Sequence, residues 1–450
     1  MSLPRYEKCK DSGVAWLGSV PAHWDVKCLK HACEVFPSNI DKKSYDDEVP
    51  VLLCNYTDAY YNERITLGME FMAATATLEQ TKKFSLRAGD TIVTKDSETA
   101  DDIAIAAYVP HDLPGVVCGY HLSMVRPREG TCGAFVKRMF DSSYAKAKLG
   151  VLANGLTRVG LGQYALDNLP MPIPPTDEQA KIAVFLDHET AKIDGLIEEQ
   201  KRLIELLKEK RQAVTSRAVT KGLDPNVTMK DSGVAWLGKV PAHWEVRKVN
   251  SLCSKITNGY VGPTRNILVD EGVRYLQSLH IKGNRIKFDA PYFVSEEWSN
   301  DHSKSILETG DLLIVQTGDI GQAAVVTDEF AGCNCHALII VSPIRTVVHG
   351  EYLGWVFNSD FGQSSLLSIQ TGALHPHLNC GNVKDVFVPV PPKSEQLALV
   401  RHCIQQSERV DGLMAEAESA VTLLQERRSA LISAAVTGKI DVRHLQTEAA

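Results

Sequence analysis

The sequence lacks the features of a membrane or secreted protein. No apolar run among its 450 residues approaches the 18 or so that a helix crossing a bilayer needs. The first residues, Met1 to Lys10, are too polar for a signal peptide. The 11 cysteines are scattered without the paired spacing of a disulfide framework, so we expect reduced thiols. Together these features predict a cytoplasmic protein that does not contact a membrane.

An excess of positive charge is also missing. The chain has 48 Lys and Arg against 55 Asp and Glu, a net charge of −7. Any binding of DNA must therefore come from local basic patches, or the chain must share its phosphate contacts with a partner protein. The length is sufficient for two or three domains with proper cores.

Motifs for catalysis and cofactor binding are absent as well. Gly438-Lys439 lacks the other residues of a phosphate-binding loop, and there is no Asn/Asp-Pro-Pro-Tyr/Phe stretch, glycine-rich cofactor turn or G-x-S-x-G. Cys333-Asn-Cys335-His336 lacks a second ligand pair at zinc spacing. We therefore predict no catalytic residue, no metal and no cofactor in this chain.

What the sequence does contain is a long two-sided helix from Glu178 to about Val219. Apolar residues recur there at steps of three and four, the period of a coiled coil. Gly222 and Pro225 are expected to end it. At 1.5 Å per residue the helix would be roughly 60 Å long. It is too long and too polar to lie inside a small domain, so it needs a partner helix.

The predicted partner is in the same chain. Adding 217 to each number gives a second helix, from about Glu395 to Val436, with the same prolines and the same Glu-Gln pair at its entry. Gly195 and Gly412 occupy matching places, which indicates either a gap or close approach there or an accident retained through duplication. We predict that the two helices pair antiparallel through Ile193, Leu196, Leu203, Leu207, Val214, Val410, Leu413, Leu424 and Leu431.

A second motif repeats with a similar period. Residues 10–26 and 230–246 differ at only two of 17 positions, so one domain-sized module is duplicated in tandem. Trp16, Leu17, Pro21 and Trp24 are predicted to dock the start of each domain onto the end of a long helix. The predicted organisation is a first domain (1–175), a first helix (176–222), a second domain (223–392), a second helix (393–441) and a tail (442–450). An antiparallel helix pair would place residues 10–26 beside Val436 to Asp441.

The stretches between these motifs share an order of elements but not a sequence. Each has a turn that leads into a strand (90–94 and 311–315), then further strands, then helical pieces near 133–148 and 351–367. The predicted fold class is α+β: two mixed α/β recognition domains and two long helices paired as an antiparallel coiled coil, with pseudo-two-fold, circular organisation. Helices and docking motifs that repeat closely around two dissimilar domains suggest two recognition surfaces that read different targets.

Loops are the best candidates for contacts with DNA bases, because their side chains can reach the grooves. Every candidate has an alternative as an ordinary solvated turn or surface lysine, and His375 is more simply explained as part of a loop. The candidates in the first domain are Lys95, Ser97, Glu98, Tyr120, His121, Lys82 and Lys83. Those in the second domain are Thr257, Asn258, Tyr260, Gln316, Thr317, Gly318, His336, His375 and Lys255.

The repeated W-L-G…P-x-H-W motif, the P-x-P-P…E-Q helix entry and the D-G-L at each helix centre, all duplicated, resemble the specificity subunit of Type I restriction–modification enzymes. The resemblance implies that each domain reads one half of a split, asymmetric site in double-stranded DNA, and that the helices set the unread spacer. It also implies two methyltransferase (modification) subunits as partners, with restriction/translocase subunits attached through them. S-adenosylmethionine, ATP and Mg²⁺ would then be bound by those partners.

Two other classes of protein compete with this interpretation. A catalytic DNA enzyme with degenerate motifs would need a cofactor site that the sequence does not contain. A coiled-coil scaffold joining two protein-binding domains is compatible with the acidic net charge. The scaffold predicts no sequence-dependent binding of duplex DNA.

Overall fold

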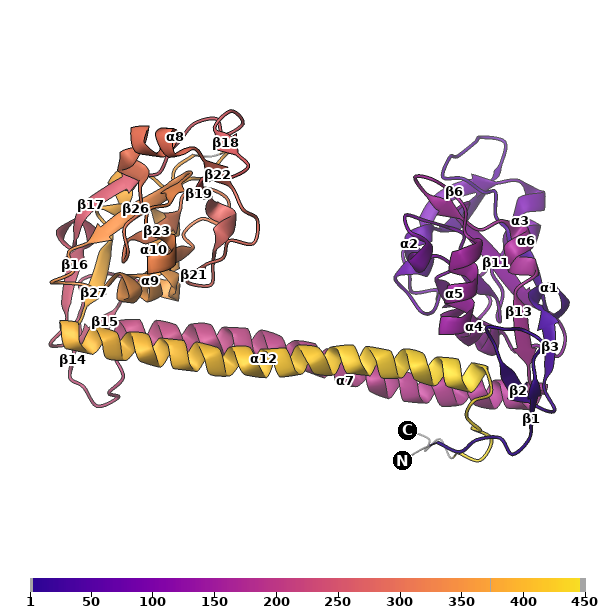
Figure 1. Cartoon of the computed structure of the whole chain (residues 1–450). Helices are drawn as coiled ribbons and strands as arrows, with labels where there is room; N and C mark the ends of the chain where they lie inside the picture. The colour runs from indigo at the N-terminus through magenta and orange to yellow at the C-terminus, as the bar shows by residue number, and fades with distance from the viewer. Residues whose placement is uncertain (1–2, 373, 446–450) are drawn as a thin grey trace. The chain divides into compact units, whose positions relative to one another are not determined.

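The computed structural model describes residues 3–372 and 374–445, and the chain divides into two compact units (Figure 1). The first unit comprises residues 1–200 with 419–450, and the second comprises residues 201–418. Residues 446–450 of the predicted tail lie outside the described residues. Each long helix contributes one half to each unit.

The first unit is built on a four-stranded antiparallel sheet in the order β4-β11-β7-β9. The predicted turn and strand are present: Gly89, at φ +93°, leads into a strand whose four residues are all buried. A second, three-stranded sheet has the order β10-β5-β6. The elements are β1 Cys9–Asp11, β2 Ser19–Pro21, β3 Asp25–Cys28, α1 Leu29–Ala32, β4 Cys33–Pro37, β5 Val49–Cys54, α2 Tyr56–Tyr60, β6 Met72–Ala76, α3 Leu78–Phe84, β7 Thr91–Thr94, β8 Asp96–Ser97, β9 Ala106–Tyr108, β10 Val116–Cys118, β11 Leu122–Pro127, α4 Gly133–Asp141, α5 Ser143–Leu152, β12 Val159–Gly160, α6 Gln163–Asp167 and β13 Pro170–Ile173.

The second unit repeats the four-stranded sheet in the order β17-β26-β23-β24, although its sequence differs. Its second sheet, β18-β22-β19-β25, has no counterpart of the same strand order in the described part of the first unit. The elements are β14 Met229–Asp231, β15 Lys239–Pro241, β16 Glu245–Lys248, β17 Cys253–Asn258, β18 Leu268–Val269, β19 Val273–Leu276, β20 Ile281–Lys282, β21 Arg285–Ile286, β22 Phe293–Val294, α8 Glu296–Asp301, β23 Leu312–Val315, β24 Ala323–Val325, β25 Asn334–Cys335, β26 Leu338–Pro343, α9 Gly350–Asn358, α10 Asp360–Ser368, α11 Cys380–Val383 and β27 Phe387–Val390.

The two long helices, α7 (Thr176–Lys221) and α12 (Lys393–Val436), run antiparallel. In the first unit the guanidinium of Arg428 donates to Asp194 at 2.8 Å, and in the second unit Arg211 donates to the equivalent Asp411 at 2.5 Å. The same pair of interactions therefore recurs with the roles of the helices exchanged. The predicted fold class, two α/β domains with an antiparallel helix pair, is confirmed.

The seam between the helices departs from the predicted register at three leucines. Ile193, Leu207 and Val410 are buried, and Val214, Leu424 and Leu431 are half-buried. Leu196, Leu203 and Leu413, however, are 45%, 43% and 43% exposed. The neighbouring residues Ile197, Ile204 and Met414 are buried or half-buried instead. A strict alternation of four- and three-residue steps from Ile193 reaches 197, 200, 204 and 207, so the seam passes beside the predicted leucines.

The docking motif and the Glu-Gln pair at the helix entry form one contact. Glu178 is buried and accepts hydrogen bonds from Trp24 Nε1 at 3.1 Å and Tyr6 Oη at 2.5 Å, with His23 Nε2 at 2.8 Å. In the second unit Glu395 accepts from Trp244 Nε1 at 3.1 Å, with His243 Nε2 at 2.8 Å. Each helix therefore begins with a carboxylate that satisfies the polar groups of the docking motif.

The adjacent glutamine ties the helix to its α/β domain. Gln179 accepts from the backbone N–H of Cys132, just before α4, at 2.8 Å and donates to Pro174 O. Gln396 accepts from the N–H of His349, just before α9, at 2.9 Å and donates to Pro391 O. The repeated Glu-Gln pair therefore joins three parts of each unit: the docking motif, the start of the long helix and the segment before α4 or α9.

The docking motif also contacts the end of the other helix in its unit. In the first unit Lys439 Nζ donates to Ser19 O at 2.7 Å, and Gly438 lies against Pro21 and Trp24. In the second unit Lys221 Nζ donates to Lys239 O, which is the equivalent carbonyl. The predicted closeness of residues 10–26 to the end of the second helix is confirmed.

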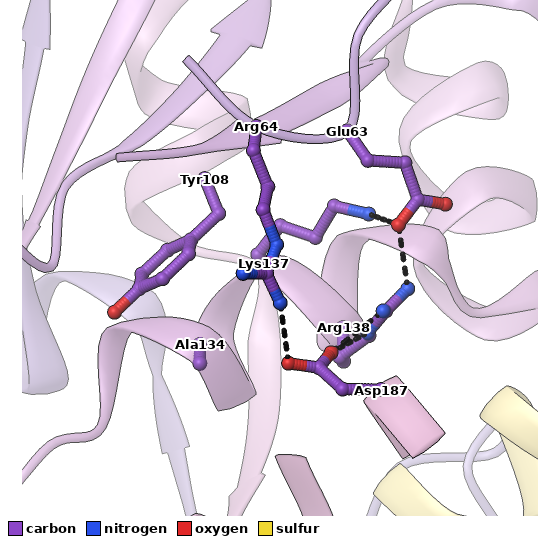
Figure 2. Close-up of a pocket in the computed structure, with 7 residues that line it drawn as sticks. All are labelled: Glu63, Arg64, Tyr108, Ala134, Lys137, Arg138 and Asp187. Atoms are coloured by element: carbon purple, nitrogen blue, oxygen red, sulfur yellow. Dashed lines mark hydrogen bonds and ion pairs between the residues drawn. The ribbon is translucent and has the colours of Figure 1, made fainter. Parts of the chain in front are cut away.

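One cluster of charges occurs in the first unit without a counterpart at the equivalent positions of the second. The Glu63 carboxylate lies 3.1 Å from both Lys137 Nζ and Arg138 Nη1 (Figure 2). It also pairs with Arg428 of α12. Arg138 pairs in addition with Asp187 of α7 at 2.7 Å. The cluster thus joins the α/β domain to both helices within this unit.

Candidate nucleic-acid interface

The same edge of the four-stranded sheet carries the candidate residues in both units. Antiparallel pairing places the end of β4, the start of β11 and the end of β7 together in the first unit. The end of β17, the start of β26 and the end of β23 meet in the same way in the second unit. The loops at these equivalent edges are the candidate interface.

In the first unit this edge gathers Lys95, Tyr120 and His121. Lys95 Nζ donates to Ser38 O at 3.1 Å and lies 4.5 Å from the centre of the Tyr120 ring. The backbone N–H of Lys95 donates to His121 O at 3.1 Å. The Tyr120 side chain remains 50% exposed, so it can reach a ligand while the backbone around it is fixed.

His121 is oriented by a carboxylate that the sequence analysis did not single out. Its Nδ1 lies 2.7 Å from Asp96 Oδ2, which leaves the other ring nitrogen available. Four acidic residues, at 96, 98, 101 and 102, follow β7, which ends at this edge. Carboxylates repel phosphates but can accept a hydrogen bond from the amino group of cytosine. This edge is therefore suited to base contacts more than to phosphate contacts.

In the second unit the equivalent edge carries aromatic rings. Tyr260 lies edge-on to Trp298 and to His302, with ring centres 5.1 Å apart in each case, and Trp298 stacks on His302 at 3.9 Å. His336 Nδ1 lies 3.3 Å from Tyr275 Oη. Burial lowers the pKa of His336, so its ring is neutral at pH 7 and can both donate and accept a hydrogen bond.

Gln316 stands at the end of β23, in the place that Lys95 takes in the first unit. Its backbone carbonyl accepts from Leu378 N at 3.0 Å. Its side-chain Oε1 is buried and has no hydrogen-bond partner among the described residues. A buried polar atom without a partner is uncommon in folded proteins, so the Gln316 side chain has an unmet hydrogen-bonding requirement.

The other candidates are less closely grouped. Ser97 is buried and Glu98 is exposed beside the edge in the first unit, whereas Lys82 and Lys83 lie exposed on α3, which packs on β5 and β10. In the second unit Thr257 and Asn258 end β17, Lys255 lies further back on that strand, and the exposed Thr317 and Gly318 follow Gln316. His375 is exposed in the loop that Leu378 attaches to Gln316.

Sequence reasoning missed Asp96, Trp298 and His302. The spacing of Trp298 and His302, four residues apart where a short helix ends, was a usable signal, because such residues face the same side. Nothing in the sequence pairs Asp96 with His121, because β7 and β11 bring them together only in the folded sheet.

Sites of other kinds are not seen in the part of the chain that the structure describes. No group of three or more His, Cys, Asp or Glu side chains there could hold a metal ion. Among the same residues, no helix has the length and hydropathy that crossing a membrane requires.

Comparison with known proteins adds independent observations. The sequence profile of the Type I restriction modification DNA specificity domain matches residues 21–206. The chain is 21% identical over 433 residues to a putative Type I restriction enzyme MjaX specificity subunit of Methanocaldococcus jannaschii, covering 95% of this chain and 96% of that protein. Over nearly its whole length the chain is thus similar to a Type I restriction enzyme specificity subunit.

Two further comparisons extend this similarity. It is 21% identical over 284 residues to the Type I restriction enzyme MjaVIII specificity subunit of the same archaeon; that match covers 62% of this chain and 64% of the relative, less than two thirds of its length. A chain from a solved Type I restriction–modification structure, concerned with complex assembly and conformational transition, superposes with a TM-score of 0.69 at 17% identity, covering 93% of this chain and 98% of that one. This likeness supports the fold of the specificity subunit.

Proposed function

We propose that this specificity subunit selects the DNA site of a Type I restriction–modification complex, with each α/β domain reading one half of an asymmetric bipartite sequence. The observation that carries the proposal is the equivalent sheet edge. It has the same backbone position in both units but holds different side chains, Lys95 with Tyr120 and Gln316 with His336. One frame with two sets of contact groups suits one site with two unlike halves.

The chemistry of the two edges suggests different preferences. Lysine donates to the O6 and N7 atoms of guanine, and Asp96 or Glu98 could accept from cytosine. Glutamine can make two hydrogen bonds to adenine, and Gln316 Oε1 has no other partner among the described residues. These assignments concern side-chain chemistry alone and do not name a sequence.

The chain itself is proposed to carry out no chemistry. S-adenosylmethionine, ATP and Mg²⁺ would act on the methyltransferase and translocase subunits. Exposed leucines on the long helices, Leu196 and Leu206 on α7 and Leu413 and Leu423 on α12, offer apolar surface to the methyltransferase subunits. A side chain at Gly195 or Gly412 would meet nothing within 4 Å, so both positions are open to a partner.

Methylation mapping tests the proposal directly. DNA from cells that express the chain with its modification and restriction subunits should carry methyl groups in one split, asymmetric motif. Cells that lack this chain should show no such motif. A continuous or symmetric motif would overturn the two-domain reading, and methylation that persists without this chain would overturn its role in specificity. A purified complex that shifts all duplexes equally would favour the scaffold alternative.

A further inference from the structure

A short loop recurs beside both sheet edges. In the first unit the backbones of Asn154 and Gly160 exchange hydrogen bonds of 3.1 and 2.9 Å, closing a five-residue loop. In the second unit Thr371 and His377, each 217 residues further on, exchange two hydrogen bonds of 2.9 Å. The offset is the same as that between the long helices.

A backbone hydrogen bond attaches each loop to the residue that we propose reads the base. The N–H of Leu161 donates to Lys95 O at 2.8 Å, and that of Leu378 donates to Gln316 O at 3.0 Å. The backbone of each loop is thereby held at the candidate edge. The α/β domains diverged in sequence, yet this attachment was retained.

A glycine opens each loop, and the geometry explains why. Gly155 and Gly372 have φ angles of +150° and +94°, which favour glycine. A Cβ atom would approach the carbonyl oxygen three residues later, 1.8 Å from Arg158 O and 2.5 Å from His375 O. The turn that the glycine permits therefore presents Arg158 and His375 at the same position of the two loops.

Arg158 adds a second cation, besides Lys95, at the acidic edge of the first unit. It is exposed and makes no ion pair with a carboxylate in the described part of the chain. It directly precedes β12, whose Val159 and Gly160 pair with Ser97 and Asp96 of β8, so its backbone lies beside the candidate edge. An exposed guanidinium without an ion pair among the described residues is placed to meet an outside anion.

We infer that Arg158 and His375 contact DNA phosphates beside the two base-reading edges and fix the register of each domain on the duplex. The inference rests on the proposed function. A contact that two domains share while reading unlike half-sites has to address what those half-sites have in common. The phosphodiester backbone is that common feature, and donors from arginine and imidazole suit its oxygens.

The test uses the full complex with its modification subunits and a duplex carrying the mapped site. Arg158→Ala should weaken binding about tenfold, the loss of one charge-assisted hydrogen bond. The slope of log K against log salt should fall by about 0.9, the value of one phosphate contact. Discrimination against single base changes in either half-site should stay the same. His375→Ala should also weaken binding and leave the discrimination between bases unchanged. Arg158→Lys should recover part of the salt slope.

Arg5→Ala removes the same charge from the segment before β1 and serves as the control. Its salt slope should match that of the wild type. Unchanged binding by Arg158→Ala, or a loss confined to particular base pairs, would overturn the phosphate role. A wild-type complex that shows no sequence preference would instead refute the proposed function, so the two failures are distinguishable.

Discussion

Glu63 shows how a single side chain can couple a domain to its helices. Burial alone would raise the pKa of its carboxyl group, but the positive charges of Lys137, Arg138 and Arg428 outweigh that effect and lower the pKa from 4.5 to about 2. The carboxylate contacts cations of α4 (Figure 2) and also Arg428 of α12, so its ionised form links the domain to that helix.

The lowered pKa predicts an acid-sensitive contribution to stability. A carboxyl group with a depressed folded-state pKa stabilises fully above its unfolded-state pKa, and the contribution is lost as the pH falls from about 4.5 toward 2. We expect Glu63→Gln to lower the midpoint of urea unfolding at pH 7. At pH 3 the difference between the midpoints of the variant and the wild type should be smaller. A midpoint of Glu63→Gln equally far below that of the wild type at both pH values would contradict the ionic role.

The carboxylates at the helix entries allow a matched comparison between the repeats. Replacing Glu178 by alanine leaves the buried N–H of Trp24 and the hydroxyl of Tyr6 without their acceptor. An unsatisfied buried group costs about 1–3 kcal/mol, so the loss should be roughly 2–6 kcal/mol. Glu395→Ala should cost less, because Glu395 serves Trp244 and His243 but no tyrosine. Denaturant unfolding of both variants measures their losses in free energy of unfolding. A larger loss for Glu395→Ala than for Glu178→Ala would reject this account.

At the scale of elements, the heptad pattern predicted both helices and their antiparallel pairing but not every residue of the seam. Leu196 and Ile197 are adjacent and equally apolar, so composition cannot decide which one faces the partner helix. The structure decides in favour of Ile197 because Thr190, Ile193 and Ile197 keep the four- and three-residue steps. The leucines left outside are the surface that we propose for the methyltransferase subunits.

The candidate sites were predictable only in part, for a physical reason. The loops after β7 and β23 follow turn signals in the sequence and could be found. The partners of their side chains could not, because Asp96 meets His121, and Tyr260 meets Trp298, through strand pairing and loop packing between distant segments. The lysines of α3 were chosen for charge alone, which does not specify a place in the fold.

Leu206 and Leu207 separate the two faces of α7 in one pair of variants. Leu207 is buried in the seam, at 7% exposure, and Leu206 is 51% exposed. Leu207→Ala should lower the free energy of unfolding by roughly 2–5 kcal/mol. Leu206→Ala should change it by less than about 0.5 kcal/mol. In a pull-down with the methyltransferase subunit, Leu206→Asp should lose the partner while the chain stays folded. If Leu207→Ala and Leu206→Ala lowered the free energy of unfolding equally, the assignment of Leu207 to the seam would be contradicted.

At the scale of the whole molecule, duplication explains why the helix entries and docking motifs stayed alike in the two repeats while the α/β domains diverged. The Glu-Gln entries, the docking motifs and the lysines at the helix ends make equivalent bonds in both units, so a change in any of them breaks a contact that recurs in the other repeat. The sheet edges have no such constraint beyond their backbone. Side chains there can change while the fold persists, which is what the proposed reading of two unlike half-sites requires.

The same frame is proposed to set the unread spacer, and a deletion of equal length in both helices tests it. Removing residues 197–203 together with 414–420 takes one heptad from each helix and leaves the order of seam positions intact. Seven residues correspond to about 10 Å of helix, or roughly three base pairs of duplex. Methylation mapping should then report the same two half-sites with a shorter spacer. An unchanged spacer in a complex that still methylates DNA would show that the helices do not measure the site, because the only altered quantity was their length.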